Sequence, residues 1–138
     1  MIYILDTNAV SALMKGLPEV VERLAGVARS DVRMPQPVVA EIAYGLERLP
    51  KSKRRSELQA RFELICAEIA RAEWADAVSQ AFGRIKAALE RRGQRVEDFD
   101  AAIAAHALAV DATLVTSNLD QMTRIRGLRV EDWARPNR

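Results

Sequence analysis

The N-terminal stretch constrains the fold most, because it places a buried strand directly before a helix. Residues 2–5 are apolar and rich in strand formers. The polar residues Asp6 to Asn8 follow, and apolar residues then recur at helical spacing from Val10 to Met14. So short an apolar run before a helix is typical of a buried parallel strand. Asp6 then lies at the carboxyl end of a strand, where open α/β sheets bind ligands. Helix capping by Asp6 or Asn8 is the alternative.

Strand and helix signals alternate along the rest of the chain, which predicts an α/β fold. Proline at a first turn indicates helices that begin near Pro18 and Pro37. The other helices are expected around residues 58–65, 74–92 and 98–110, and the other strands over 32–34, 112–116 and 128–130. Residues 66–70 fit either a helix end or a short strand. This alternation favours a parallel sheet with helices on both faces, in one domain spanning residues 1–138.

The composition is ordinary for a folded domain, and its cysteine content indicates the kind of cellular compartment. Hydrophobic residues make up 49% of the chain and charged residues 29%. Cys66 is the only cysteine, so no intrachain disulfide can form and a reducing compartment is favoured. No apolar run approaches the roughly 18 residues of a membrane span, and we expect a soluble, cytoplasmic protein. The net charge of +2 is compatible with a nucleic-acid partner without indicating one.

Two carboxylates interrupt apolar helix faces. Glu41 shares one side of its expected helix with Val38, although glutamate is rarely buried without a partner. Asp100 opens a helix of mostly small and apolar residues from Ala101 to Ala109. Both side chains are therefore candidates for a functional site. For Glu41, the alternative is an ion pair with a basic residue such as Arg48.

Asp98 and His106 belong to the same expected helix as Asp100 but do not share its face. Asp98 is rotated by about 200° from Asp100, so we interpret it as a cap or a first-turn acid. His106 is the only histidine of the chain, and we interpret it as a structural or surface residue.

A third polar group, Thr116 to Asn118, follows the expected strand over residues 112–115, and Asp120 lies shortly after it. These residue types favour turns, so a capped turn is the alternative. The carboxyl ends of parallel strands and the helices that follow them meet in one cleft. We therefore expect this group to lie near Asp6.

The oxygen-bearing residues at this cleft predict a metal site. Several carboxylates in one cleft repel one another unless a cation neutralises them. A donor set of oxygens, without histidine or cysteine, suits Mg²⁺ or Mn²⁺ rather than zinc. Such an ion can activate water and stabilise charge on a phosphate. The sequence therefore predicts metal-assisted hydrolysis of a phosphodiester.

Four motifs occur in a familiar order and spacing: Leu5-Asp6-Thr7-Asn8, Val39-Ala40-Glu41-Ile42 with Gly45, Gly93 before Phe99-Asp100-Ala101-Ala102-Ile103-Ala104-Ala105, and Leu114-Val115-Thr116-Ser117-Asn118. With them, the chain resembles the PIN-domain ribonucleases, and within them the VapC-type toxins of toxin–antitoxin pairs. The C-terminal stretch from Gly127 to Val130 and Trp133 are also similar to that family. The resemblance implies a three-layer α/β/α sandwich with a central, mainly parallel sheet.

The resemblance implies a magnesium or manganese site whose ligands are three carboxylates: Asp6, Glu41 and Asp100. The family's fourth acidic position falls on Asn118, an amide that can still accept a hydrogen bond through its oxygen. Whether Asp120 replaces the missing carboxylate stays open. Thr116 matches a residue that helps to hold the metal-bound water or the phosphate. Thr7 and Asn8 are expected to brace the loop around Asp6 by side-chain to backbone bonds.

The resemblance also implies partners. A small DNA-binding antitoxin typically wraps the toxin and inserts a basic side chain into its acidic cleft. The helix pair from Pro37 to Ile65 offers an apolar groove for such a segment. A homodimer with a shared RNA-binding groove is implied as well. Basic residues that fit RNA phosphates form two clusters, with solvated helix ends as the alternative: Lys51, Lys53, Arg54 and Arg55, and Arg84, Lys86, Arg91, Arg92 and Arg95.

Two other functions stay open at this point. The amide at Asn118 weakens the metal site, so one alternative is a non-catalytic PIN-like module that binds RNA or a protein. The other is a housekeeping nuclease that processes RNA and has no antitoxin.

Overall fold

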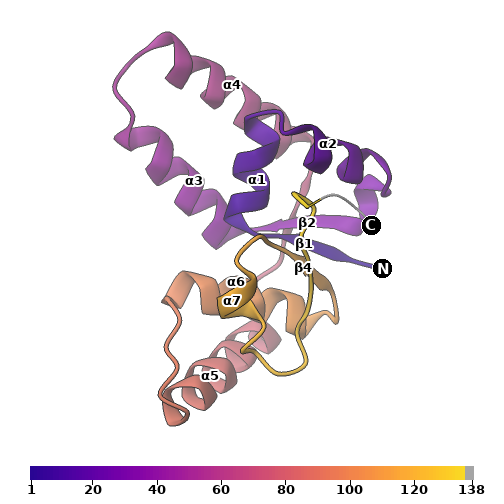
Figure 1. Cartoon of the computed structure of the whole chain (residues 1–138), viewed down its shortest axis with the longest axis vertical. Helices are drawn as coiled ribbons and strands as arrows, with labels where there is room; N and C mark the ends of the chain where they lie inside the picture. Colours follow the sequence, from indigo (N-terminus) through magenta and orange to yellow (C-terminus); the bar gives the residue numbers. More distant parts are fainter. Residues whose placement is uncertain (136–138) are drawn as a thin grey trace.

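A central parallel sheet organises the computed structural model, which describes residues 1–135 (Figure 1). Its five strands are β1 (Tyr3–Leu5), β2 (Val32–Pro35), β3 (Ala70–Ala72), β4 (Thr113–Val115) and β5 (Arg129–Glu131). They lie in the order β3-β2-β1-β4-β5, and all neighbours pair in parallel. The expected mainly parallel sheet is therefore confirmed, with β1 at its centre. Residues 136–138, the end of the expected domain, lie outside the described residues.

Helices cover the sheet on both sides, as a three-layer α/β/α sandwich requires. The helices within residues 1–135 are α1 (Thr7–Met14), α2 (Pro18–Ala25), α3 (Gln36–Arg48), α4 (Lys53–Glu68), α5 (Asp76–Arg91), α6 (Asp98–Ala109) and α7 (Leu119–Met122), with a short 3₁₀ turn at Arg29–Asp31. In Figure 1, α1 and α2 lie above the strands and α5 and α6 below them, while α3 and α4 form a projecting hairpin. None of the helices within residues 1–135 is both long and apolar enough to span a membrane.

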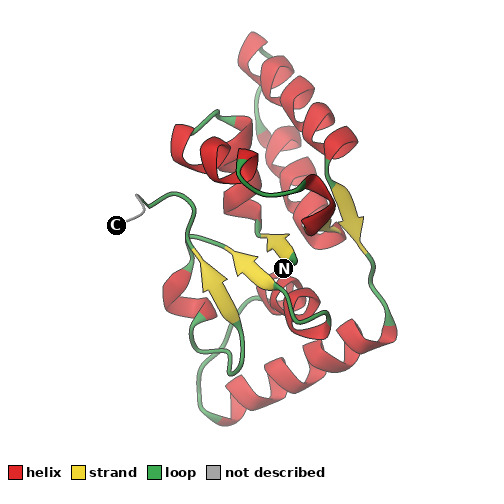
Figure 2. Cartoon of the chain, turned by 90° about the vertical axis from the view of Figure 1, so that its right-hand side faces the viewer, coloured by secondary structure: helices red, strands yellow, loops and turns green. Residues whose placement is uncertain are grey.

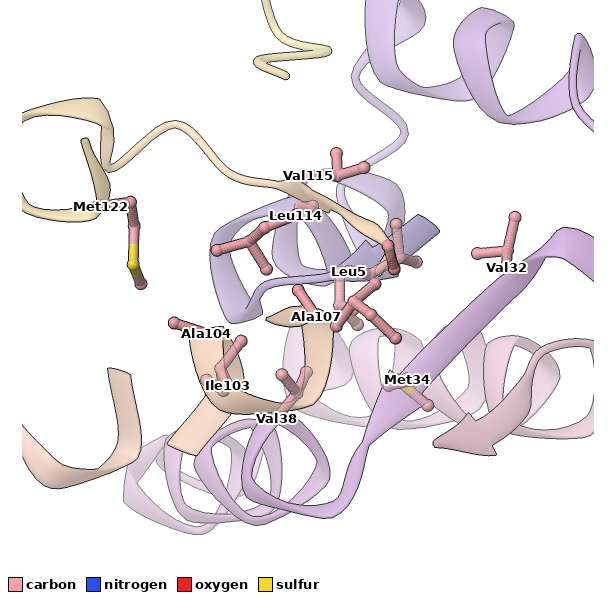
Figure 3. Close-up of a cluster of buried hydrophobic side chains, with 14 of the residues drawn as sticks. Leu5, Val32, Met34, Val38, Ile103, Ala104, Ala107, Leu114, Val115 and Met122 are labelled. Atoms are coloured by element: carbon pink, nitrogen blue, oxygen red, sulfur yellow. The ribbon is translucent and has the colours of Figure 1, made fainter. Parts of the chain in front are cut away.

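The small residues of α6 let it pack closely against the centre of the sheet. Every residue from Ala101 to Ala107 is buried, and five of these seven positions are alanine. Ile103 points from α6 toward the sheet, where Leu114 of β4 and Leu5 of β1 are buried (Figure 3). Helix α5 packs on α6 from outside, and Figure 2 shows it as a long helix along one edge of the molecule. This packing fixes where the first turn of α6 lies.

The structure differs from the sequence expectation in a few local details. The ambiguous region after Cys66 continues α4 to Glu68 and then forms strand β3. Helix α7 was not expected, because a single turn has too few residues to show a helical period. Asp98 is the first residue of α6 rather than its cap, and Glu97 occupies the cap position without a capping side-chain bond. The interpretation of Asp98 as a first-turn acid is confirmed.

Candidate active site

Asp6 lies where β1 ends and α1 begins, and its side chain is only 2% exposed. One carboxylate oxygen, Oδ1, accepts a hydrogen bond from the backbone N–H of Thr7 (2.7 Å). The other, Oδ2, accepts from Thr116 Oγ1 (2.7 Å) and Asn8 Nδ2 (3.3 Å). Burial raises the pKa of Asp6, and these three hydrogen bonds oppose that rise without cancelling it. Asp6 thus caps α1 and is also a buried acid without a cationic partner among the described residues, at the end of the central strand.

Thr116 and Asn8 join the carboxyl ends of β1 and β4 around Asp6. The buried Thr116 hydroxyl donates to Asp6 and accepts from Asn8 Nδ2 (3.2 Å) and from the backbone N–H of Asn118 (2.9 Å). Asn8 Oδ1 accepts from the backbone N–H of Ser117 (2.9 Å). The expected bracing by Asn8 through a backbone bond is confirmed, whereas the Thr116 hydroxyl is used to orient Asp6.

Glu41 reaches toward Asp6 from helix α3. Its Oε1 accepts a hydrogen bond from Thr7 Oγ1 (2.8 Å), and Thr7 donates its backbone N–H to Asp6. Thr7 therefore links the two acids, with its backbone N–H on Asp6 and its hydroxyl on Glu41, where a bond from its side chain to the backbone was expected. The alternative ion pair with Arg48 does not form, because the Arg48 guanidinium lies over the ring of Tyr44 at 5.5 Å.

Asp100 lies in the first turn of α6 and is half-buried. Burial first, and then the negative charges of Asp6, Glu41 and Glu97, raise the pKa of Asp100 to about 6. Asp6, Glu41 and Asp100 therefore interact electrostatically as one group of like charges. Asp98 differs in its surroundings, because its Oδ1 pairs with Lys86 Nζ at 3.0 Å.

A cavity of about 510 Å³ opens beside these acids, between the end of α5, the first turn of α6 and α7. Glu41, Asp98 and Asp100 line this cavity, which we call the acid cavity. Gln121 also lines it and accepts from Asn118 Nδ2 at 3.1 Å. Gln121 was missed by the sequence analysis because no local signal indicates α7. Glu97 was also missed, although an acid directly before a helix is a recognisable feature.

Residues 3–128 match the family model of the PIN domain. The chain belongs to the PIN-domain family. It is 31% identical to ribonuclease VapC2 of Rickettsia felis over 96% of this chain and 98% of that protein. It is 32% identical to the tRNA(fMet)-specific endonuclease VapC of Salmonella typhimurium, over 95% and 97% of the two chains.

Solved structures that are similar to this PIN domain are also VapBC proteins. The VapBC2 complex of Rickettsia felis bound to a promoter DNA fragment contains a chain that superposes with a TM-score of 0.83 at 27% identity, over 96% of this chain and 99% of that one. The DNA-bound VapBC complex of Salmonella typhimurium gives 0.84 at 29% identity, over 96% and 98%. The resemblance to VapC-type toxins is therefore confirmed.

The donor set of the PIN domain fits a hard divalent cation in charge and in chemistry. Asp6, Glu41 and Asp100 offer oxygen atoms only, and none of them forms an ion pair within residues 1–135. A cation would relieve the repulsion that raises the pKa of Asp100. Within the described residues, no three acidic, histidine or cysteine side chains already converge tightly enough to hold a metal ion. Binding would thus require the carboxylates to draw together.

The remaining candidates take different positions around the site. Asn118 precedes α7, and its backbone and side chain bond to Thr116 and Gln121. Asp120 is exposed and does not line the cavity in the described part of the chain. His106 is buried, with Nδ1 2.8 Å from the carbonyl oxygen of Ala102, and burial lowers its pKa. His106 is therefore not a surface residue, and its interpretation as a structural residue stays a prediction.

Proposed function

We propose that residues 1–138 form one PIN-like domain that is a divalent-metal-dependent endoribonuclease and the toxin of a toxin–antitoxin pair. The raised pKa of Asp100, caused by burial and by Asp6 and Glu41, carries the proposal. Several carboxylates that interact with one another and have no cationic side chain as partner favour the binding of a cation. The relatives support the RNA substrate, since they are named ribonuclease VapC2 and tRNA(fMet)-specific endonuclease.

The roles of the side chains follow from their contacts. Asp6, Glu41 and Asp100 would hold Mg²⁺ or Mn²⁺. Bound there, the cation would supply Lewis acidity toward water and a phosphodiester. Thr116 orients Asp6 through the 2.7 Å bond to Oδ2, and Thr7 orients Glu41 through the 2.8 Å bond to Oε1. These bonds fix the orientation of Asp6 and Glu41, so drawing the three carboxylates together would be the main rearrangement that cation binding requires.

The purified chain, incubated with total bacterial RNA, tests the proposal. We expect RNA fragments when Mg²⁺ or Mn²⁺ is added and intact RNA when EDTA removes the metal. The fragment lengths, read against a size marker, distinguish the two kinds of nuclease. An endonuclease cuts within a long RNA and gives fragments of intermediate length, whereas an exonuclease releases nucleotides from one end. RNA that stays intact in both ions would support the non-catalytic module instead.

The non-catalytic alternative keeps one observation in its favour. No three potential ligands are preassembled within residues 1–135, and Asn118 supplies an amide where the family pattern has an acid. The metal affinity of the isolated chain therefore separates the two functions more directly than the fold does.

Replacing Asn118 by aspartate should tighten metal binding. The backbone N–H of Asn118 bonds to Thr116, which bonds to Asp6, so a new carboxylate adds charge next to the proposed ligands. We expect one Mn²⁺ per chain in the parent protein and about tenfold tighter binding in Asn118→Asp, measured by titration calorimetry. Asp120→Asn is the control and should leave the affinity unchanged, because Asp120 is exposed. Two tight sites in the parent would contradict the assignment of Asn118.

The antitoxin partner is supported by a second groove and by the solved relatives. A groove of about 350 Å³ between α1, α3 and α4 is lined mainly by apolar residues such as Ile42, Leu46 and Leu58. Glu41 lines both this groove and the acid cavity. A helix in the groove could therefore place a basic side chain on the acids. The matched structures are VapBC complexes bound to DNA, which supports a cytoplasmic, DNA-binding antitoxin. A homodimer stays part of the proposal, for light scattering to test.

A further inference from the structure

A basic groove runs beside the acid cavity, on the other side of helix α5. It measures about 500 Å³ and lies between α5 and the segment that follows α7. Its floor is apolar and includes Ile85, Leu108 and Ile125. Its basic side chains are four arginines: Arg84, Arg91, Arg92 and Arg126. We refer to these four residues and the floor between them as the arginine groove.

The charge of the arginine groove is uncompensated. No acidic side chain lines it, and none of its four arginines forms an ion pair within residues 1–135. Arg92 Nη2 donates to the carbonyl oxygen of Arg124 at 2.6 Å, which fixes the guanidinium without neutralising it. The whole chain carries a net charge of only +2. Four unpaired cations in one groove are therefore a local concentration of charge.

Helical spacing aligns two of these arginines, and a third follows them at the helix end. Arg84 and Arg91 lie at positions i and i+7 of α5, which share one face and are about 10 Å apart along the axis, and Arg92 is the C-cap residue directly after the helix. A row of cations of this length fits a linear polyanion. The groove contains no aromatic side chain among its lining residues, so it offers no platform on which bases could stack. The chemistry therefore favours contacts with phosphates over contacts with bases.

Helix α5 also connects the arginine groove with the acid cavity. Leu89 lines both hollows. Lys86 and Glu90 face the acid cavity, whereas Arg91 and Arg92 face the groove. A nucleic-acid strand that leaves the cavity across the end of α5 would thus meet the arginines directly.

We propose that the arginine groove binds the phosphate backbone of the substrate RNA while the acid cavity holds the phosphodiester that is cut. This inference rests on the proposed ribonuclease function and adds the surface that holds the substrate. Because phosphates are the groups recognised, the groove raises affinity for RNA of any sequence and leaves the choice of cleavage site to the acid cavity.

The second basic cluster of the chain provides a matched control. Lys51 and Lys53 are exposed at the turn between α3 and α4. Arg55, in the same cluster, pairs with Glu47 at 3.3 Å and donates to the carbonyl oxygen of Leu49. Lys51 and Lys53 line neither the arginine groove nor the acid cavity. Reversing their charges changes the net charge as much as reversing two arginines does.

The test compares Arg84→Glu/Arg91→Glu with Lys51→Glu/Lys53→Glu. All four positions are exposed, so both variants should fold, which circular dichroism checks. Binding to a fluorescein-labelled single-stranded RNA is measured by anisotropy in EDTA, where no cleavage is expected. We expect the arginine variant to bind at least about tenfold more weakly than the lysine variant, and its salt dependence to fall by about 1.4 in log–log slope for two lost phosphate contacts.

The outcomes separate the groove from the proposed function. Equal affinities for the two variants would overturn the groove as an RNA surface. Cleavage of total RNA by the parent chain with Mg²⁺ is measured in parallel. If the parent cleaves RNA and the arginine variant binds it normally, the groove fails and the ribonuclease stands; if the parent cleaves nothing, the ribonuclease itself fails.

Discussion

Replacing Asp100 by asparagine should abolish metal-dependent RNA cleavage and make the metal-free protein more stable at neutral pH. Cleavage is lost because the amide removes one of three negative charges proposed to hold the cation. Stability rises because Asp100 is destabilised by burial and by the charges of Asp6 and Glu41, which raise its pKa to about 6. A neutral amide of similar shape avoids both costs.

The direction of the pH effect follows from proton binding. Between the ordinary pKa of 3.8 and about 6, the folded chain binds more protons at Asp100 than the unfolded chain does. Stability of the parent protein therefore falls as the pH rises through this window and stays lower above it. Because Asp100 is only half-buried and solvent screens its charge, we expect about 1–2 kcal/mol rather than the full value of the shift.

Urea unfolding at pH 4.5 and pH 7.5, with EDTA throughout, measures this prediction. The gap in unfolding free energy between Asp100→Asn and the parent should widen at the higher pH. Asp98→Asn is the control from the same helix turn: Asp98 is exposed and pairs with Lys86, so it should change neither cleavage nor the pH profile. Full cleavage by Asp100→Asn would remove Asp100 from the site.

Asp6→Asn should also abolish cleavage, but its stability should fall. Both oxygens of the Asp6 carboxylate act as hydrogen-bond acceptors, and their donors are Thr7, Asn8 and Thr116. An amide in the same place turns its NH₂ group toward one of these donors and leaves buried polar groups unsatisfied. For this reason Asp100 is the better position for separating activity from folding.

Expression of the chain alone should arrest bacterial growth, and co-expression of its adjacent small gene should restore it. Continuous RNA cleavage stops translation, while the antitoxin segment would cover the acid cavity from the groove lined by Ile42, Leu46 and Leu58. Colony counts and growth curves after induction give the measurement. Asp100→Asn, induced to the same soluble level, should grow normally.

Unimpaired growth with soluble parent protein would favour the non-catalytic module. Arrest without an adjacent gene that relieves it would favour the housekeeping nuclease. The two readouts together therefore distinguish the three functions that the sequence left open.

The sequence predicted those features of the proposed site that show as a local pattern of apolar and polar residues. Asp6 was proposed as a site residue because a short apolar run ends at it, and Glu41 and Asp100 because each interrupts an apolar helix face. The parallel sheet followed from the alternation of strands and helices, and the structure confirms it. Local periodicity was sufficient for these features because burial itself imposes it.

Features that depend on distant contacts could not be predicted. The bond from Thr7 to Glu41 joins residues on different helices, and nothing near either residue indicates it. Gln121 lies in a helix of one turn, too short to show a period. The arginines were grouped by sequence alone with Lys86 and Arg95, whereas the structure places those two in the acid cavity and Arg84 in the groove.

The hydrogen bonds between the ends of β1 and β4 also limit how early during translation the proposed acid site can form. They join Thr116 to Asp6 and Ser117 to Asn8. They join residues that lie about 110 positions apart along the chain. At translation rates of about 5–20 residues per second, the ribosome needs roughly 5–20 s to make Thr116 after Asp6. Until then β4 is absent, and the Asp6 carboxylate lacks the hydrogen bond from Thr116 that completes its surroundings. The proposed acid site can therefore be completed only after β4 has been synthesised, late in the translation of the chain.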